Sequence, residues 1–239
     1  MEGVIIKVIS VVGKKDSGKT SLTIKIIKEL KKRGFKVASI KHSHHMLEMD
    51  RKNTDTWKHK EAGSETVAGI GSRTFFNIDK DLPLERILFL IKLIDEPDFV
   101  VIEGFKNYNY SKISTSKETE DEYTLKTVNP LEIKDEEVLG LVNTIEKCSY
   151  DIIDTLYTDN CGLNDRESIG KAIISGENLN IDDIDVSLSI NEKVIGLNYF
   201  VNNFMKNSVL GMLKSLKTED YGIKAFEKIE IVIKNGNKK

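Results

Sequence analysis

The chain has 239 residues, of which 39% are hydrophobic and 31% charged, with a net charge of −2. This length fits one full domain plus a smaller one, with enough apolar residues for a buried core. No run of about 18 apolar residues occurs, so we expect no membrane span. The chain starts without the basic segment and cleavage site of a secretory signal. It contains only Cys148 and Cys161, which fits a reducing cytoplasm better than a disulfide framework.

The charge is unevenly distributed along the chain. Residues 1–60 carry a net charge of +9, so the remainder carries −11. A basic N-terminal quarter favours an anionic ligand. The pI of about 6.2 argues against nucleic acid as that ligand, because nucleic-acid-binding domains show a strong overall basic excess.

A phosphate-binding motif lies near the N-terminus. The sequence Gly13-Lys14-Lys15-Asp16-Ser17-Gly18-Lys19-Thr20 matches the pattern G-x-x-x-x-G-K-[ST] of P-loop nucleotidases. Residues 4–12 before it are almost all apolar and predict a buried strand. Residues 18–33 after it repeat apolar side chains every fourth position and predict an amphipathic helix. A chance match in a glycine turn is the alternative, which the flanking strand and helix disfavour.

The chemistry of this motif follows from its residue types. Gly13 and Gly18 let the backbone turn tightly, so that its N–H groups and the helix N-terminus attract an anion. Lys19 is expected to reach the β- and γ-phosphates, and the Thr20 hydroxyl to face Mg²⁺. Arg33-Gly34 ends the helix, and residues 35–41 predict a second strand parallel to the first.

The following polar segment holds all four histidines of the chain: His42, His44, His45 and His59. A short helix is expected over residues 55–62 with Asp55 as its cap. A loop at the carboxyl end of the second strand lies beside the phosphate site, so Asp50 or Asp55 could hold Mg²⁺ and the histidines could contact phosphate or base. A plain solvated loop is an alternative. A zinc site is a weaker one, because no cysteine is near and the spacing matches no common pattern.

The middle of the chain predicts further elements of an α/β fold. Short strands are expected at 66–70 and 74–78, where Arg73 in the turn could reach an anion or be a surface charge, and a helix at 84–93. Residues 98–105 predict a buried strand that ends in the carboxylate Glu103, the form of a Walker B element acting on Mg²⁺ or its water.

Beyond residue 105 the predictions are less specific. Residues 106–126 predict an excursion that contains a strand at 112–115. Residues 138–142 predict another strand, and its end at Asn143-Thr144 could approach the nucleotide base. The guanine-reading signature N-K-x-D is absent, so no motif settles the choice of base.

The remaining residues predict an appendage to the nucleotide-binding domain. We expect that domain over 1–158, a connecting segment over 159–179 with a helix at 167–175, and a small ββαβ unit over 180–239. In this unit residues 186–197 predict a hairpin and residues 200–216 a helical apolar stripe. Residues 229–233 predict the final strand.

The order of these motifs resembles the MobB family of molybdopterin-guanine dinucleotide biosynthesis adaptor proteins, over roughly residues 1–145. The resemblance rests on Thr20 to Leu22, Gly34 to Val37, Lys41-His42, His45, Asp50, Asp55-Thr56, Glu61 to Ser64 and Val101 to Lys106. It implies a P-loop fold, GTP binding, Mg²⁺ dependence, weak GTP hydrolysis and a homodimer. It also implies partnership with the guanylyltransferase that joins GMP to molybdopterin.

The motif and the resemblance together define the predicted site. The predicted nucleotide-binding residues are Gly13, Lys14, Lys15, Asp16, Ser17, Gly18, Lys19, Thr20, Ser21, Lys41, His42 and His45. The predicted metal-binding residues are Thr20, Asp50 and Glu103. The C-terminal third resembles extensions of longer, archaeal-type relatives, some of which carry a cysteine motif of the kind C-G-L-x-C-G-x-x-S-C that suggests an iron–sulfur or other metal site. Here the first cysteine, Cys161, and the serine of that motif remain. The two cysteines of the chain cannot supply four thiolates, so we expect no iron–sulfur cluster.

Two other functions remain open at this point. A small-molecule kinase or ligase of the same fold would use Asp50 or a histidine as its base and would need a second substrate pocket. A pure interaction module would act through residues 180–239, with nucleotide binding incidental.

Overall fold

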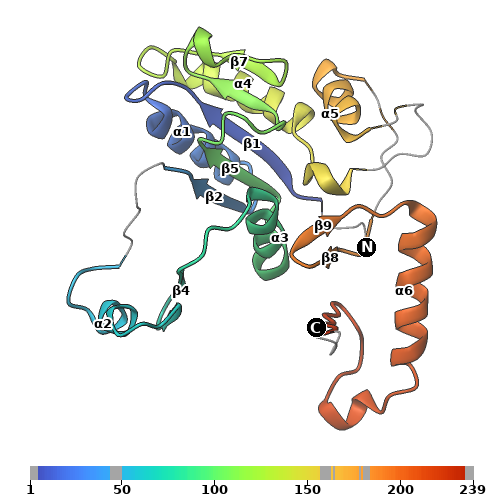
Figure 1. The fold of residues 1–239 in the computed structure, drawn as a ribbon. Coiled ribbons are helices and arrows are strands. Elements are labelled where there is room, and N and C mark those ends of the chain that lie inside the picture. Colours follow the sequence, from blue (N-terminus) through green and yellow to red (C-terminus); the bar gives the residue numbers. More distant parts are fainter. Residues whose placement is uncertain are drawn as a thin grey trace.

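The computed structural model describes residues 5–43, 50–156, 163, 165–177, 179 and 184–234. A five-stranded sheet forms its centre (Figure 1). The strands are β1 (Lys7–Val12), β2 (Val37–Lys41), β5 (Phe99–Glu103), β6 (Lys112–Ser114) and β7 (Thr124–Thr127), in the spatial order β2-β5-β1-β6-β7. All four pairings are parallel. The predicted α/β class with a mostly parallel sheet is confirmed.

Helices cover both faces of this sheet. On one face lie α1 (Lys19–Lys32) and α4 (Asp135–Cys148), and on the other lie α3 (Leu84–Asp95) and α5 (Arg166–Ser175) (Figure 1). The apolar stripe of α1, Leu22, Ile26 and Leu30, is fully buried. Because β1 and β5 are covered on both faces, they read as nearly continuous apolar runs, as buried parallel strands do.

The order of the strands reverses at β1. From β1 the chain builds β2 and β5 on one side of it, and then β6 and β7 on the other. In an open parallel sheet, ligands bind in the crevice outside the carboxyl ends of the strands at such a point. Residues 13–18 begin at that end of β1, so the topology places the glycine loop where a ligand is expected.

Residues 50–78 form an excursion from the sheet. It contains α2 (Asp55–Glu61) and the antiparallel hairpin of β3 (Thr66–Ile70) and β4 (Thr74–Ile78), which project to one side (Figure 1). The two predicted strands and the helix are confirmed. The predicted cap is wrong by one residue, because the Thr54 hydroxyl, not Asp55, accepts from the Trp57 N–H.

The C-terminal part forms only some of the predicted appendage. The hairpin is present as β8 (Leu188–Ile190) and β9 (Lys193–Ile195), and the helix as α6 (Tyr199–Leu213). The predicted strand at 229–233 is not formed. Three short 3-10 turns complete the described elements: Lys117–Thr119, Ile153–Thr155 and Thr218–Tyr221. Among the described helices, none has both the length and the apolar character needed to cross a membrane.

The predicted strand at 138–142 is wrong, because these residues belong to α4. Their burial follows a helical period, since Val138, Leu141, Val142 and Ile145 face the core. Three acidic residues precede them in the first helical turn, where negative charge is favourable. The strand that pairs with β6 is instead β7, whose sequence T-L-K-T is short and half polar.

Candidate nucleotide-binding site

The loop after β1 has the backbone conformation of an anion-binding turn. Gly13, Asp16 and Gly18 have positive φ angles of 155°, 58° and 79°. A Cβ atom at Gly13 would lie 1.8 Å from the Oγ1 of Thr115, so only glycine fits there. Successive residues that alternate between left- and right-handed conformations turn their N–H groups toward one concave side, which favours an anion.

Hydrogen bonds from the neighbouring strand hold the loop in this shape. The Ser17 hydroxyl donates to the Lys14 carbonyl at 2.7 Å and lies 2.6 Å from the Oγ1 of Thr115. Thr115 follows β6, and its hydroxyl also bonds the carbonyl of Val12 at 3.2 Å. The loop is therefore fixed before any ligand arrives, which lowers the cost of binding.

The start of α1 offers an electropositive surface. Gly18 is the N-cap and supplies no side-chain cap, and the first turn holds no acidic residue. Its N–H groups therefore remain available for phosphate oxygens. The Lys19 ammonium bonds the Lys14 carbonyl and so lies across the loop. Lys14 and Lys15 are exposed at the rim.

A carboxylate and a hydroxyl meet beside the loop. Glu103 ends β5, is 5% exposed, and accepts a hydrogen bond from the Thr20 hydroxyl at 2.8 Å through its Oε1. The ammonium of Lys41 bonds the same oxygen. The register of the sheet causes this meeting, because Lys41 and Glu103 are direct neighbours on adjacent parallel strands.

These groups fit the requirements of Mg²⁺. The ion prefers oxygen ligands, usually one or two protein oxygens with waters and substrate phosphates completing the shell. Thr20 and Glu103 supply a hydroxyl and a carboxylate next to a phosphate-binding loop. No described residue hydrogen-bonds the Oε2 of Glu103, which leaves this oxygen available to a metal ion or its water.

The predicted histidine group is only partly described. The backbone N–H of His42 donates to the Glu103 carbonyl at 2.9 Å, and its ring packs on Phe105 with centroids 4.1 Å apart. Gly104 has φ +112°, and a Cβ there would lie 3.0 Å from the Cβ of His42. His42 therefore lies against the backbone at the end of β5. His44 and His45 lie outside the described residues.

In the structure Asp50 forms its bonds within the excursion rather than with Thr20 or Glu103, the other residues predicted to bind the metal. Its Oδ1 accepts from the hydroxyls of Thr54 and Thr56 at 2.8 and 3.1 Å, within the excursion. Partial burial opposes ionisation of Asp50, but these hydrogen bonds hold its pKa below the ordinary value. Within the described ranges no hydrogen bond joins Asp50 to Thr20 or Glu103, so its role at the metal stays a prediction.

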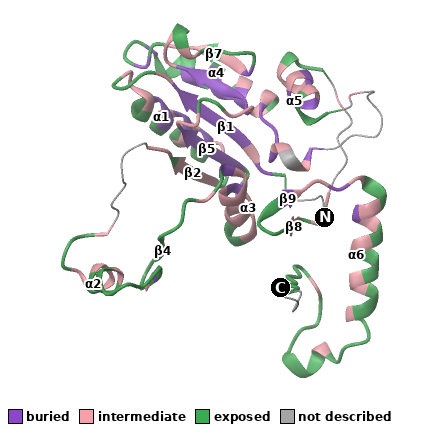
Figure 2. Cartoon of the chain, viewed as in Figure 1, coloured by how far each residue is buried: buried purple, intermediate pink, exposed green. Residues whose placement is uncertain are grey.

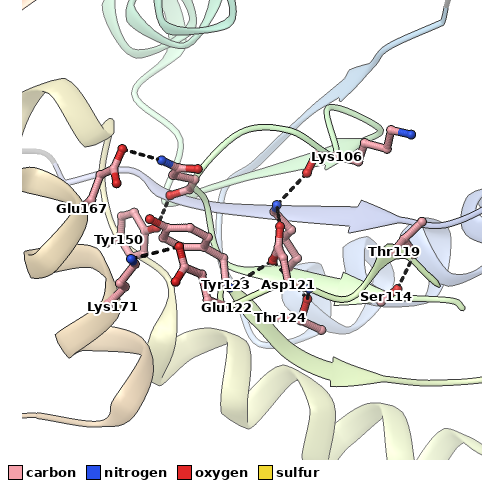
Figure 3. Close-up of polar contacts among 12 residues, drawn as sticks. Lys106, Ser114, Thr119, Asp121, Glu122, Tyr123, Thr124, Tyr150, Glu167 and Lys171 are labelled. Carbon is pink, nitrogen blue, oxygen red and sulfur yellow. Dashed lines mark hydrogen bonds and ion pairs between the residues drawn. The ribbon is translucent and has the colours of Figure 1, made fainter. Parts of the chain in front are cut away.

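Sequence reasoning missed the contribution of the loop between β6 and β7. Glu118 of this loop pairs with Lys14 at 2.7 Å, and the Ser114 and Thr119 hydroxyls lie 2.6 Å apart. Lys112 is only 1% exposed and anchors the loop, because its ammonium bonds Asp121 and the Lys106 carbonyl (Figure 3). The sequence did contain one signal for this loop, because Lys112 lies within a predicted strand and a buried lysine needs a partner.

The same loop connects the nucleotide site to α5. Glu122 of this loop accepts from Lys171 at 2.9 Å, and Asn109, which precedes β6, donates to Glu167 at 2.8 Å (Figure 3). The Tyr123 ring lies between two ammonium groups, those of Lys112 and Lys171, each 5.7 Å from its centre. The connecting segment therefore packs against the loop that borders the phosphate site.

The turn after β7 is a second feature that sequence reasoning missed. A Cβ at Gly18 would lie 2.8 Å from the Cβ of Pro130, so this turn touches the start of α1. The predicted approach of Asn143 to the base is wrong. Its side chain accepts from Arg33, just past the C-terminal end of α1 and far along the helix from Gly18.

A glycine loop between a buried strand and a helix, at the reversal point of a parallel sheet, defines a P-loop nucleotide-binding protein. Residues 8–139 match the family model of molybdopterin guanine dinucleotide synthesis protein B, MobB. The chain belongs to this family, because the match covers more than half of its 239 residues.

Two relatives that match by sequence agree with the family assignment. The putative molybdopterin-guanine dinucleotide biosynthesis adapter protein of Methanocaldococcus jannaschii is 32% identical over 227 residues, 90% of this chain and 93% of the relative. The Haemophilus influenzae adapter protein is 33% identical over 139 residues, 54% of this chain and 78% of the relative. A crystal structure of Bacillus subtilis MobB is 29% identical with a TM-score of 0.42, covering 52% of this chain and 76% of that one.

Proposed function

We propose that this protein binds GTP with Mg²⁺ and acts as an adaptor in the synthesis of the molybdopterin guanine dinucleotide cofactor. One observation carries the nucleotide part of the proposal: Thr20, Lys41 and Glu103 meet beside the loop of residues 13–18. The adaptor part is supported by membership of the MobB family and by the names of the relatives.

Each group at the site has a defined task in this proposal. The loop N–H groups and Lys19 hold the phosphates, and Lys19 exchanges its bond to the Lys14 carbonyl for one to phosphate. Thr20 and Glu103 hold Mg²⁺, which neutralises phosphate charge when it is bound. Lys41 holds the Glu103 carboxylate in place, because its ammonium bonds the same oxygen as the Thr20 hydroxyl.

Slow hydrolysis fits the composition of the chain. Fast P-loop GTPases orient the attacking water with a glutamine and stabilise the transition state with an arginine. This sequence contains no glutamine at all. Its arginine nearest the motif in sequence, Arg33, pairs with Glu29 and Glu146 at the far end of α1. The site therefore holds GTP better than it cleaves it.

We further propose that the protein works as a homodimer and presents GTP and molybdopterin to a guanylyltransferase. The isolated hairpin of β3 and β4 supports a dimer. Two-stranded sheets are marginally stable alone, and this one exposes Ile70 at 84% and Phe76 at 61%. A light-scattering mass equal to two chains is expected, and a monomer at all concentrations would contradict the dimer.

Calorimetric titration with GTP and ATP, each with and without Mg²⁺, tests the nucleotide site. We expect GTP to bind more tightly than ATP and Mg²⁺ to strengthen binding. Lys19→Ala is expected to weaken binding at least about 100-fold, while Thr20→Ala should remove the Mg²⁺ dependence but keep part of the affinity. Circular dichroism should show both variants folded. Unchanged affinity in Lys19→Ala would exclude the P-loop as the nucleotide site. A clear preference for ATP would contradict the proposal that GTP is the bound nucleotide.

A second experiment tests the adaptor role. Purified guanylyltransferase should form cofactor faster when this protein is added, and Lys19→Ala should remove the stimulation. Rapid ATP turnover that depends on an added metabolite would instead support a small-molecule kinase.

A further inference from the structure

The turn that follows β7 lies at the same edge of the sheet as the phosphate loop. Because β1 and β7 belong to one parallel sheet, their carboxyl ends face the same crevice. Pro130 is buried and packs against Gly18. A Cβ atom added to Gly18 would lie only 2.8 Å from the Cβ of Pro130. Asn129 and Leu131, on either side of Pro130, are both exposed. The turn therefore borders the space that extends beyond the phosphates of a bound nucleotide.

Three sets of bonds make this turn rigid. The Asn129 carbonyl accepts from the N–H groups of Glu132 and Ile133 at 3.2 and 3.0 Å. The Asn129 side-chain oxygen accepts from the Leu131 N–H at 3.2 Å. The Ile133 carbonyl accepts from the Lys25 ammonium of α1 at 2.9 Å. The turn is thus attached to the helix that begins at the phosphate loop.

The bond to Leu131 fixes which end of the Asn129 amide faces outward. A backbone N–H can only donate, so the atom facing it must be the side-chain oxygen. The amide nitrogen points the other way, and no described residue accepts a hydrogen bond from it. Asn129 consequently presents two amide donors on the side away from Leu131, while its oxygen is held by the Leu131 N–H.

This arrangement discriminates between purine bases. Guanine carries two acceptors on one edge, O6 and N7, whereas adenine carries the acceptor N7 beside the amino donor at position 6. Two amide donors complement guanine and leave the adenine amino group facing a donor. Leu131, which is 84% exposed, offers an apolar surface for a base face next to this donor.

We propose that Asn129 selects guanine over adenine by donating from its amide to O6 and N7, while Leu131 packs on the base. This inference rests on the proposed function, because it requires a nucleotide bound at the phosphate loop. It supplies a base-reading residue in a chain that lacks the N-K-x-D signature.

Binding of GTP, ITP and ATP to the full-length protein and to Asn129 variants tests the proposal. Hypoxanthine retains O6 and N7, so we expect ITP to bind almost as tightly as GTP, and ATP at least about tenfold more weakly. Asn129→Asp keeps the acceptor for the Leu131 N–H but replaces the donors by an acceptor. It should weaken GTP binding at least about tenfold and reduce or reverse the preference over ATP.

Two further variants separate base reading from a damaged turn. Asn129→Ser keeps a short acceptor for the Leu131 N–H and replaces the two amide donors by a single hydroxyl on a shorter side chain, which cannot bond O6 and N7 together. It should therefore lose the GTP preference with ATP affinity unchanged. Leu131→Ala should weaken GTP and ATP equally, because either base can pack on an apolar surface. Asn143→Asp, on α4 beside Arg33, is the matched control and should change neither affinity.

The outcomes distinguish this inference from the proposed function. If no triphosphate binds in a Lys19-dependent way, the proposed function fails. If binding depends on Lys19 but both Asn129 variants keep the wild-type ratio of GTP to ATP affinity, the inference alone is overturned.

Discussion

Two stretches of similar apolar composition differ in structure: one is a buried strand, and the other is exposed and forms no strand. β5 has the sequence F-V-V-I-E and is buried at every position, whereas residues 229–233, I-E-I-V-I, form no strand. Val232 and Ile233 are 84% and 86% exposed. Figure 2 shows the same contrast at a larger scale, since buried residues concentrate in the sheet, whereas α6 and the tail consist mostly of exposed and intermediate residues. An apolar run is therefore not sufficient for a strand.

The difference lies in what surrounds each stretch. β5 hydrogen-bonds to β2 on one side and β1 on the other. Its two faces contribute to separate apolar clusters, Val101 to the one with α1 and Val100 to the one with α3. Among the described residues, 229–233 pairs with no strand. Burial of apolar side chains supplies the free energy that a strand needs, and the tail lacks it.

The largest effect expected from this comparison concerns one phenylalanine from each region. Phe99 is 1% exposed, so Phe99→Ala should lower the free energy of unfolding by about 3–5 kcal/mol through lost burial and a cavity. Phe204 on α6 is 65% exposed, so Phe204→Ala should cost less than about 0.5 kcal/mol. Urea denaturation followed by circular dichroism measures both. Equal losses would show that α6 is buried in solution.

The second prediction compares a buried ion pair with an exposed one. Lys92 of α3 bonds Asp151 at 2.8 Å, and both side chains are about 13% exposed or less. Lys92→Met leaves the carboxylate buried without a cation, which should cost about 3 kcal/mol at neutral pH. The control Lys80→Met breaks an exposed pair with Glu192 and should change little.

The loss in Lys92→Met should depend on pH. Desolvation already raises the pKa of Asp151 although Lys92 opposes this, and removing Lys92 raises it further. The native state then binds more protons than the unfolded state, so the stability of the variant falls as pH rises above the ordinary pKa of the carboxyl. Denaturation at about pH 5 should show a smaller loss than at about pH 7.5. A loss independent of pH would contradict the assignment.

The sequence predicted the elements whose signals are local. β1, the glycine loop and α1 each combine a hydrophobic pattern with a positional glycine, and Glu103 ends an unmistakable apolar strand. Residues 138–142 were misread because V-L-G-L-V is too short to separate a strand from a buried helix by pattern alone. The position of Asp50 depends on bonds to Thr54 and Thr56 within the excursion, and that of Asn129 on a contact between Pro130 and Gly18. Spacing along the chain does not reveal such contacts.

Gly13→Ala probes the loop where the buried core meets the site. The new Cβ would lie 1.8 Å from the Oγ1 of Thr115, so we expect the free energy of unfolding to fall by about 2 kcal/mol. Nucleotide binding should be lost as well. Gly34→Ala is the matched control, because Gly34 also has a positive φ but nothing lies within 4 Å. It should cost about 1 kcal/mol and leave GTP affinity unchanged. Adding Thr115→Ala to Gly13→Ala should restore part of the stability, and no recovery would locate the strain elsewhere.

The smallest effect is expected at the ion pair that attaches the tail to the core. Lys228 bonds Glu96 at 2.8 Å just beyond α3, and both side chains are about 40% exposed. The hydrogen bond to Glu96 raises the pKa of Lys228, but solvent screens such a pair. Lys228→Met should therefore change the free energy of unfolding by less than about 0.5 kcal/mol. Limited proteolysis should cleave the tail of this variant faster than that of the wild type. Because Lys92→Met makes the same substitution in the core, a comparable loss at Lys228 would mean that the tail is packed as firmly as the sheet.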